Sequence, residues 1–224
     1  LDKTYFVIWT TTTWTLPGNL AICVGPEYEY TVVKADGENY IMAAELVPAA
    51  MKARGVENYT TEGSFKGSEL EYMKTAHPFM NRESLVIVGD HVTLESGTGC
   101  VHTAPGHGVD DFIVCQKYKE IPIVVPVNDK GVLTEEAGQF AGLTTDEANK
   151  PIAEHLEKIG ALFALKKIKH QYPHCWRCHK PVIFRATSQW FCSVDDFKDA
   201  AVKAAEDVKW YPEWGKDRLQ SMVL

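Results

Sequence analysis

Short apolar runs separated by turn residues fill most of the chain up to about residue 130, a pattern typical of β-strands. Most of these runs are rich in β-branched and aromatic side chains, and Pro17-Gly18-Asn19 and Gly25-Pro26 supply turn signals between them. The strand candidates lie at residues 5–9, 20–24, 28–33, 84–89, 91–94, 121–127 and 161–169. These runs predict a fold that is mainly β.

Four other segments carry helix signals, at residues 43–54, 110–119, 144–160 and 195–207. Gly55 closes the first helix, and Thr144-Thr145-Asp146-Glu147 forms a capping box at the start of the third. In the third helix Pro151 is expected to cause a kink or a restart. The side chains expected to face inward are Phe112, Ile113 and Cys115 in the second helix and Ala148, Ile152, Leu156 and Ile159 in the third.

From His170 onward the character of the chain changes, because aromatic residues and cysteines cluster there. Many short strands with helices between them predict a mixed β/α fold, mainly β, in which a closed β-barrel-like core carries peripheral helices. We predict that residues 1–169 form this domain and that residues 170–224 form a C-terminal appendage.

Composition narrows the classes of function that the chain can have. A dedicated nucleic-acid binder carries a basic face, whereas this chain has a net charge of -7 and gathers basic residues only at 166–170. The backbone of any bound nucleic acid is therefore expected to be held mostly by other parts of the protein. No apolar run approaches the roughly 20 residues of a membrane span, so no membrane partner is expected. Four of the six cysteines are scattered, which argues against a secreted disulfide framework and indicates a reducing, cytoplasmic location. Both ends resemble cuts from a longer protein.

The segment from Gly97 to Asp111 holds two imidazoles and two carboxylates among four glycines and a proline. Glycine lets a ligand approach the main chain closely, and a polar loop packs poorly, so this density of groups indicates a functional site. The alternative is a solvated turn in which Asp110 or Asp111 caps the following helix.

Within this segment His102 and Asp111 can fold back across the Pro105-Gly106 turn to face one cavity. Such a pair can serve as a general base, or the carboxylate alone can bind an ammonium group. His107 is either a third member or, as we favour, a residue that stabilises the loop. Cys100 fits a small buried strand residue better than a nucleophile.

Four consecutive threonines, Thr10 to Thr13, follow the first strand candidate. Their hydroxyls could grip a carbonyl, a ribose hydroxyl or a water molecule. The alternative is a threonine-rich edge strand, which β-propensity favours.

Cys175 and Cys178 have the spacing of half a tetrahedral zinc site. None of the other four cysteines is so spaced, and His174 and His179 lie too close in sequence to complete the site easily. We therefore expect zinc only together with ligands from outside this chain. Thiol–disulfide chemistry is less favoured, because no strand-to-helix redox context surrounds the motif.

These motifs resemble the editing domain of isoleucyl-tRNA synthetases. The segments that carry the resemblance are residues 8–19, 97–112, 174–178, 184–191 and 210–218. The family's threonine-rich peptide more commonly has proline where this chain has Thr13. Nothing in the chain matches the ATP-binding signatures of class I synthetases, so no amino-acid activation is expected from it.

The resemblance implies hydrolysis of the ester that joins valine to the 3′ end of tRNA(Ile), without a cofactor. It implies that Asp111 accepts hydrogen bonds from the substrate ammonium, and that His102 and Trp14 form the side-chain pocket, with His102 excluding isoleucine by size. Thr10, Thr11 and Thr12 would contact the substrate carbonyl, the terminal ribose and the attacking water. Trp9 and Thr15 would support the pocket. The implied partners are the mischarged tRNA end and the remaining domains of the same synthetase, and we expect a monomer.

Three alternatives stay open at this point. One is a metal-dependent hydrolase that uses His102, His107, Asp110 and Asp111. Another is a non-catalytic zinc-ribbon binding module centred on Cys175 and Cys178. In the third, the domain folds but is silent because tRNA needs the other domains in order to dock.

Overall fold

The structure, a computed structural model, describes residues 3–169 and 171–224, so Leu1, Asp2 and His170 lie outside the described residues. The chain divides into two compact units, Leu1–Ala186 and Thr187–Leu224. Residues 171–186 therefore lie with the first unit, which contains both sheets.

The first sheet has the strand order β1-β4-β3-β5. Its strands are β1 (Thr4–Phe6), β3 (Glu29–Ala35), β4 (Glu38–Ala43) and β5 (Thr60–Lys66). Helix α1 (Val47–Arg54) follows β4 through the short 3-10 turn η2 (Ala44–Leu46), and ends at Gly55 with a left-handed φ of 81°. Buried side chains of α1, β3 and β4 form one cluster, which places α1 against the outer face of this sheet.

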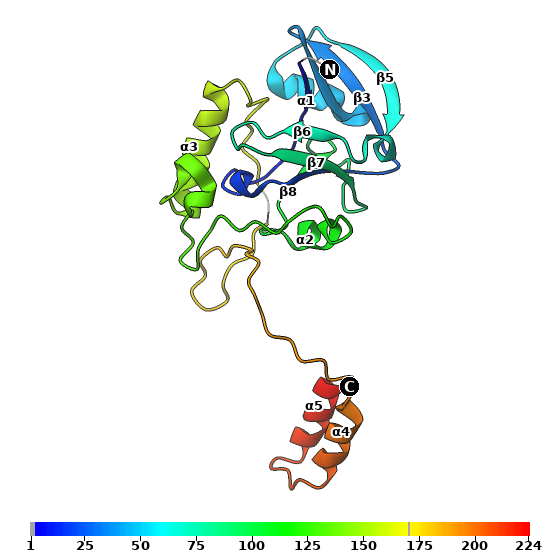
Figure 1. The fold of residues 1–224 in the computed structure, drawn as a ribbon, viewed down its shortest axis with the longest axis vertical. Helices are drawn as coiled ribbons and strands as arrows, with labels where there is room; N and C mark the ends of the chain where they lie inside the picture. Colours follow the sequence, from blue (N-terminus) through cyan, green and yellow to red (C-terminus); the bar gives the residue numbers. More distant parts are fainter. Residues whose placement is uncertain (1–2, 170) are drawn as a thin grey trace. The chain divides into compact units, whose positions relative to one another are not determined.

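The second sheet has the order β6-β7-β2-β8. Its strands are β2 (Ala21–Val24), β6 (Lys74–Ala76), β7 (Glu83–Val88) and β8 (Cys100–Thr103). All four residues of β2 are buried because both of its faces are covered. Ala21 and Cys23 pack in a cluster with helix α2 (Val109–Cys115), whereas Ile22 and Val24 pack toward the first sheet. Figure 1 shows the two sheets one above the other, with α1 beside the first sheet and α2 below the second.

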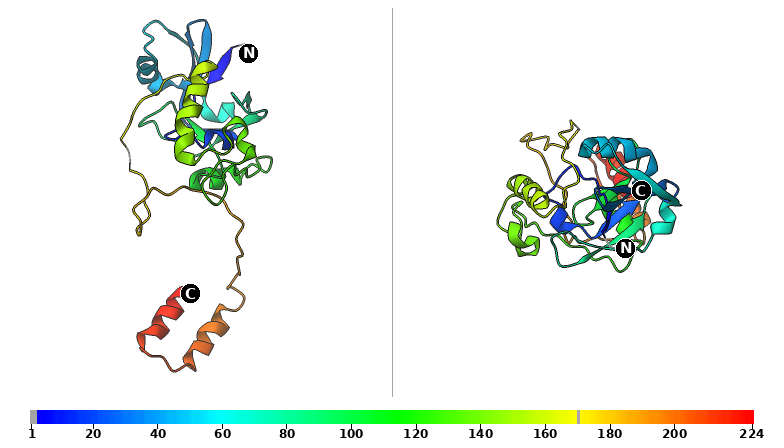
Figure 2. Two further views of the ribbon diagram at one scale, coloured as in Figure 1. Left: turned by 90° about the vertical axis from the view of Figure 1, so that its left-hand side faces the viewer. Right: turned by 90° about the horizontal axis from the view of Figure 1, so that it is seen from above.

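A third group of elements stands beside the sheets (Figures 1 and 2). It consists of helix α3 (Thr145–Lys158) and the 3-10 turns η1 (Leu16–Gly18) and η4 (Glu135–Phe140); a further 3-10 turn, η3 (Gly67–Leu70), follows β5. Ala148, Ile152 and Leu156 of α3 are buried against Trp14 and Leu16, as the spacing predicts, but Ile159 is exposed. Pro151 lies inside an unbroken helix, and the Thr144–Glu147 capping box is present.

One extended segment joins the two sheets. The Val7 N–H donates to the Ile41 carbonyl of β4 at 3.1 Å, and two residues later the Trp9 N–H donates to the Cys100 carbonyl of β8 at 2.8 Å. Trp9 and Val101 form no more than an isolated bridge, because the chain then turns away at Thr10, so no continuous strand ladder joins β1 to β8 among the described residues. At the other edges, β5 and β6 pair with no further strand among the described residues. The predicted closed barrel is therefore wrong, and the sheets stay open.

Several strand predictions also fail, for identifiable reasons. Pro122 and Pro126 lack backbone donors, and residues 121–127 form only a bridge from Val127 to Leu133. Neither residues 91–94 nor residues 161–169 form a strand or any other regular structure. Conversely, β4 follows an Asp36-Gly37 hairpin turn, in which both residues have positive φ, and this turn signal predicts the strand that the apolar pattern missed.

The second unit contains two helices, α4 (Lys198–Glu206) and α5 (Trp214–Val223), which pack on each other. The Trp210 indole N–H donates to the Ala205 carbonyl at 2.8 Å and closes the connection between them. Among the described residues no helix is long and apolar enough to cross a bilayer.

Candidate active site

The threonine segment forms a tight turn directly after the bridge at Trp9. The Thr10 hydroxyl donates to the Thr12 carbonyl at 2.8 Å and also accepts from the Thr12 N–H at 3.3 Å. Thr11, at the tip, is exposed. The Trp9 ring lies over Gly97, where a Cβ would come within 2.7 Å of the ring, so the glycine permits this contact. These threonines are therefore not an edge strand but a loop with one exposed hydroxyl at its tip.

Trp14 is buried rather than open to a pocket. Its side chain belongs to the apolar cluster around α3 and is only 5% exposed. Its ring meets the His107 imidazole edge-on, with centroids 4.9 Å apart. The backbone N–H groups of Thr13 and Trp14 both donate to the Asn149 Oδ1 of α3 at 3.1 Å. The loop is thus fixed on both sides of the threonines, to β8 at Trp9 and to α3 at Thr13.

His102 is a strand residue, not a loop residue: it lies on β8 and pairs with Ile22 of β2. Its Nε2 lies 3.0 Å from the Thr15 hydroxyl, and its Nδ1 lies 2.6 Å from the Asn19 Nδ2. Burial lowers the pKa of His102 to about 3, so the imidazole is neutral at physiological pH. Both nitrogens are engaged within the protein, which leaves neither as a base or a metal ligand.

The Thr15 hydroxyl connects two of the segments that carry the resemblance, residues 8–19 and 97–112 (the two signature segments). It donates to the Thr12 carbonyl at 3.2 Å while contacting His102. The backbone N–H of His102 in turn donates to the Trp9 carbonyl at 3.1 Å. The structure therefore brings Trp9, Thr10, Thr12, Thr15 and His102 into one connected network.

Asp111 lies in the first turn of α2. Its Oδ2 accepts from the Ala104 N–H at 2.8 Å, so it ties the helix back to the end of β8. A Cβ on Gly108 would lie 2.8 Å from the Asp111 carboxyl carbon, which explains a glycine there. Burial raises the pKa of Asp111, although the Ala104 hydrogen bond opposes the shift. A carboxylate has about four acceptor positions, so Asp111 can still accept from a ligand.

His102 and Asp111 are not paired with each other: no hydrogen bond joins them in the described part of the chain. Within residues 3–169 and 171–224 there is also no group of three or more His, Cys, Asp or Glu side chains placed to hold a metal. Together with the occupied nitrogens of His102, this arrangement gives the metal-dependent alternative no support.

His107 fastens a distant segment to the loop. Its Nδ1 lies 3.0 Å from the Phe184 carbonyl, and the Ala186 N–H donates to the Gly106 carbonyl at 2.8 Å. The Arg185 Nε donates to the Val127 carbonyl at 3.1 Å beside them. His107 therefore acts as a loop-stabilising residue, as we expected.

Cys100 is fully buried on β8, and burial raises the pKa of its thiol well above its usual range. The inward placement expected for Cys115 is correct, but Ile113 is 56% exposed. Ile113 lies on the opposite side of α2 from Val114 and Cys115, which pack on the sheet.

Cys175 and Cys178 lie on a small hairpin, well separated in sequence from the network above. The Cys175 N–H donates to the Lys180 carbonyl and the His179 N–H donates to the Cys175 carbonyl, both at 2.8 Å. Hydrogen bonds from the Cys178 and Arg177 backbone lower the pKa of the Cys175 thiol. Two thiols with amide donors fit half of a zinc site, and further ligands would have to come from elsewhere.

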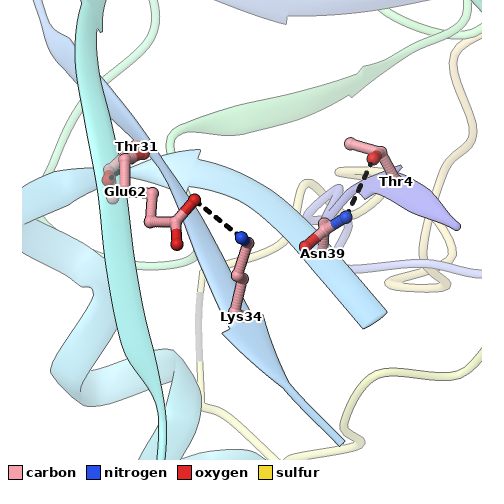
Figure 3. Close-up of polar contacts among 5 residues, drawn as sticks. All are labelled: Thr4, Thr31, Lys34, Asn39 and Glu62. Carbon is pink, nitrogen blue, oxygen red and sulfur yellow. Dashed lines mark hydrogen bonds and ion pairs between the residues drawn. The ribbon is translucent and has the colours of Figure 1, made fainter. Parts of the chain in front are cut away.

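Two cavities lie away from the predicted residues. The larger, about 630 Å³, opens between β3, β5 and η3. Its rim groups are paired with one another: Lys34 with Glu62 at 2.7 Å, and Asn39 with Thr4 at 3.4 Å (Figure 3). The smaller, about 380 Å³, lies beside Phe79 and His155. A catalytic pocket needs convergent unpaired polar groups, and the larger cavity does not supply them.

Sequence reasoning missed Asn19, Ser84 and Asn149, which hold the network in place. Asn19 and Ser84 are each only 3% exposed, and the Ser84 hydroxyl donates to the Asn19 Oδ1 at 2.6 Å. Asn19 registered only as part of a turn signal. Short polar residues ordinarily indicate exposure, so one sequence offers no sign that these are buried.

Known proteins resemble this chain over nearly its whole length. A family model described as class I tRNA synthetases (I, L, M and V) matches residues 6–224. An isoleucine–tRNA ligase from Caldicellulosiruptor bescii is 58% identical over 222 residues, 99% of this chain and 24% of that protein. One from Bacillus cereus is 56% identical over 218 residues, 97% of this chain and again 24% of the relative. The chain thus spans about a quarter of the length of the curated relatives it matches.

Solved structures show the fold. The crystal structure of GlLeuRS-CP1 has a TM-score of 0.61 at 15% identity and covers 75% of this chain and 87% of that one. The editing domain of the P. knowlesi cytosolic leucyl-tRNA synthetase has a TM-score of 0.54 at 12% identity, covering 69% and 81%. At such identities the likeness concerns architecture alone.

Proposed function

The chain belongs to the class I tRNA synthetases, and from that premise we propose that it is the editing module of an isoleucine–tRNA ligase. It hydrolyses the ester of mischarged Val-tRNA(Ile), and valyl-adenylate is its proposed second substrate. The observation that carries the proposal is the network of Thr12, Thr15 and His102, which unites the two signature segments at one place.

A second site is needed because a pocket that fits isoleucine cannot strongly exclude valine. One methylene gives only about 10–200-fold discrimination, a range for which isoleucine against valine is itself the standard example. The editing pocket must do the reverse and admit only the smaller side chain. His102 suits the role of size limit, because two hydrogen bonds and burial on β8 hold its ring in one orientation.

Asp111 would anchor the substrate through its α-ammonium group. The carboxylate is held by Ala104 at the start of α2, and it follows the same strand that presents His102. An ammonium ligand would also favour the ionised form, which burial now disfavours.

The threonines would place the substrate carbonyl, the terminal ribose and the attacking water. Thr11 is exposed at the tip of the turn, and Thr10 and Thr12 fix the shape of that turn. His102 is neutral and engaged at both nitrogens, so His102 does not serve as general base in this scheme. Rate enhancement would come from positioning a water against the ester carbonyl.

The rest of the proposal concerns partners. Residues 1–169 would be the editing domain proper, and residues 170–224 would be the connection toward the synthetic domain. The tRNA 3′ end would stack on an aromatic or apolar wall of this domain. Because the chain is acidic, other domains of the synthetase would hold the body of the tRNA. Zinc would bind Cys175 and Cys178 only with ligands from those domains. We place the protein in the cytoplasm as a monomer.

Deacylation of Val-tRNA(Ile) and Ile-tRNA(Ile) tests the proposal, both with this chain and with the intact synthetase. Asp111→Ala should abolish selective loss of valine, whereas Asp110→Ala, at the exposed neighbouring carboxylate, should leave it intact. Activity only in the intact synthetase would mean that tRNA docking requires the other domains. Equal activity of wild type and Asp111→Ala in the intact enzyme would refute the mechanism.

A further inference from the structure

Three buried polar side chains form a line behind the site. The Ser84 hydroxyl of β7 donates to the Asn19 Oδ1 at 2.6 Å. The Asn19 Nδ2 donates to the Ala21 carbonyl at 3.0 Å and faces the His102 Nδ1 at 2.6 Å. None of the described roles of the threonines or Asp111 involves Ser84 or Asn19.

The direction of every bond in this line can be deduced. The Ala21 carbonyl can only accept, so the amide of Asn19 must turn its NH₂ side toward it and its oxygen toward Ser84. The second N–H of the same NH₂ group then points at the His102 Nδ1, which must accept. Because a neutral imidazole carries one proton, that proton sits on Nε2.

The same logic extends to the threonine turn. The His102 Nε2–H donates to the Thr15 hydroxyl, and that hydroxyl is then free to donate to the Thr12 carbonyl. Each group in this line therefore donates a hydrogen bond to the next, from the Ser84 hydroxyl to the Thr12 carbonyl. Reversing the tautomer of His102 would set two N–H groups against each other at Asn19.

We propose that Ser84 is a positioning residue, which acts through Asn19 to hold His102 as the Nε2–H tautomer in one ring orientation and thereby sets the size limit of the pocket. This inference rests on the proposed editing function. Ser84 touches no substrate in it; its effect reaches the site through two side chains.

Burial explains why the serine matters. Ser84 and Asn19 are each 3% exposed and His102 is 7% exposed, so bulk water cannot replace a lost partner. Three adjacent strands carry the line: β7 holds Ser84, β2 follows Asn19, and β8 holds His102. Without the Ser84 hydroxyl, the buried Asn19 oxygen loses its donor, and the Ala21 carbonyl alone is left to hold the amide orientation, so the preference for one His102 tautomer is weakened.

Nitrogen-15 NMR of ring-labelled histidine in this chain tests the tautomer directly. We expect a protonated Nε2 and an unprotonated Nδ1 for His102 in the wild type. Ser84→Ala should give exchange between tautomers, and Ser84→Thr, which keeps a hydroxyl, should restore the wild-type pattern. Asn19→Asp should move the proton to Nδ1, because a carboxylate can only accept. A proton on Nδ1 of His102 in the wild type would overturn the proposed line of hydrogen bonds. An unchanged spectrum in both Ser84→Ala and Asn19→Asp would also overturn it.

Deacylation by the intact synthetase tests the consequence. Ser84→Ala should lower the preference for Val-tRNA(Ile) over Ile-tRNA(Ile) by about 5- to 10-fold, the scale of one lost hydrogen bond. Ser221→Ala, whose hydroxyl donates to the Asp217 carbonyl on α5, is the control and should keep the preference. An unchanged preference in Ser84→Ala overturns the positioning role. If the wild type hydrolyses neither ester, the proposed function fails. The NMR result alone then decides whether Ser84 and Asn19 hold the His102 tautomer.

Discussion

Thr13 and Asn149 are joined by three hydrogen bonds. The Thr13 hydroxyl donates to the Asn149 carbonyl at 2.7 Å and to its Oδ1 at 3.1 Å, and the Thr13 N–H donates to the same Oδ1 at 3.1 Å. Thr13 is the position at which the resembled family more often has proline. Proline has neither the N–H nor the hydroxyl, so in this chain threonine replaces a rigid ring by bonds to α3.

Asn149→Ala should therefore loosen the threonine loop. It removes the acceptor of Thr13 and Trp14, and we expect a loss of about 1–3 kcal/mol in the free energy of unfolding. Urea denaturation measures this loss. Lys150→Ala, on the same helix but 85% exposed at its side chain, should change stability by less than about 0.5 kcal/mol. Equal effects from the two variants would contradict the anchoring role.

His102→Ala should open the pocket to isoleucine. The shorter side chain removes the proposed size limit, so hydrolysis of Ile-tRNA(Ile) should rise about tenfold or more, while Val-tRNA(Ile) remains a substrate. Comparison of the two deacylation rates gives the result. His155→Ala, at the smaller cavity, is the control and should not alter the ratio. If the His102 variant leaves Ile-tRNA(Ile) intact, another group sets the size limit.

Gly108→Ala should displace Asp111 without straining the backbone, since Gly108 has an extended φ of -148°. The added Cβ would lie 2.8 Å from the carboxyl carbon, so the KM for Val-tRNA(Ile) should rise. Gly131→Ala is the matched control: its φ of 74° costs about 1 kcal/mol of stability, but nothing lies within 4 Å of the new Cβ. A similar rise in KM for both variants would show that general destabilisation is responsible.

Acid should unfold the domain through its buried histidines. Burial lowers the pKa of His77 to about 4 and that of His102 to about 3, against 6.5 in an unfolded chain. Between these values the unfolded state binds more protons, so stability falls as pH drops below 6.5, by up to about 1.4 kcal/mol per pH unit for each histidine. Asp111, with a raised pKa, acts in the opposite sense near pH 4.

Urea denaturation from pH 7.5 to pH 4.5 measures this dependence. His77→Gln should make the curve shallower, because it removes one of the two titrating rings. Equal steepness in wild type and variant would mean that His77 is not buried as a neutral imidazole.

The six cysteines should divide into two reactivity classes. Cys23, Cys100 and Cys115 are buried, and burial raises the pKa of each thiol. Cys175 has a lowered thiol pKa from backbone donors, so it should be alkylated fastest by iodoacetamide at neutral pH. Mass spectrometry of the native protein follows each site. Early labelling of any buried cysteine would contradict the packing described for the two sheets.

Some features were predictable because they depend on local sequence. The α3 helix follows from its capping box and its apolar stripe, and β2, β3 and β7 follow from short segments rich in apolar, β-branched and aromatic residues. The edge strand β5 was not predictable, because most of its residues are exposed and polar. Open sheets rather than a barrel depend on how far one bridge extends, which local sequence does not encode.

The candidate site divides in the same way. Thr10, Thr12, Thr15 and His102 do come together, and sequence singled them out. Asn19 and Ser84 could not be found, because their importance comes from where three strands place them. The Trp14 ring is packed in the core beside α3, and its place in the wall of the pocket stays a prediction.

The connection between the sheets has a mechanical consequence. Val7 belongs to one sheet, Trp9 to the other, and Thr10 follows without a spacer. The threonine turn therefore takes its register from this crossing. Adding or deleting one residue between Val7 and Trp9 would turn Trp9 to the opposite face of the extended segment and displace the threonine turn relative to His102. The number of residues between Val7 and Trp9 therefore determines the geometry of the site as much as the identity of any side chain in it does.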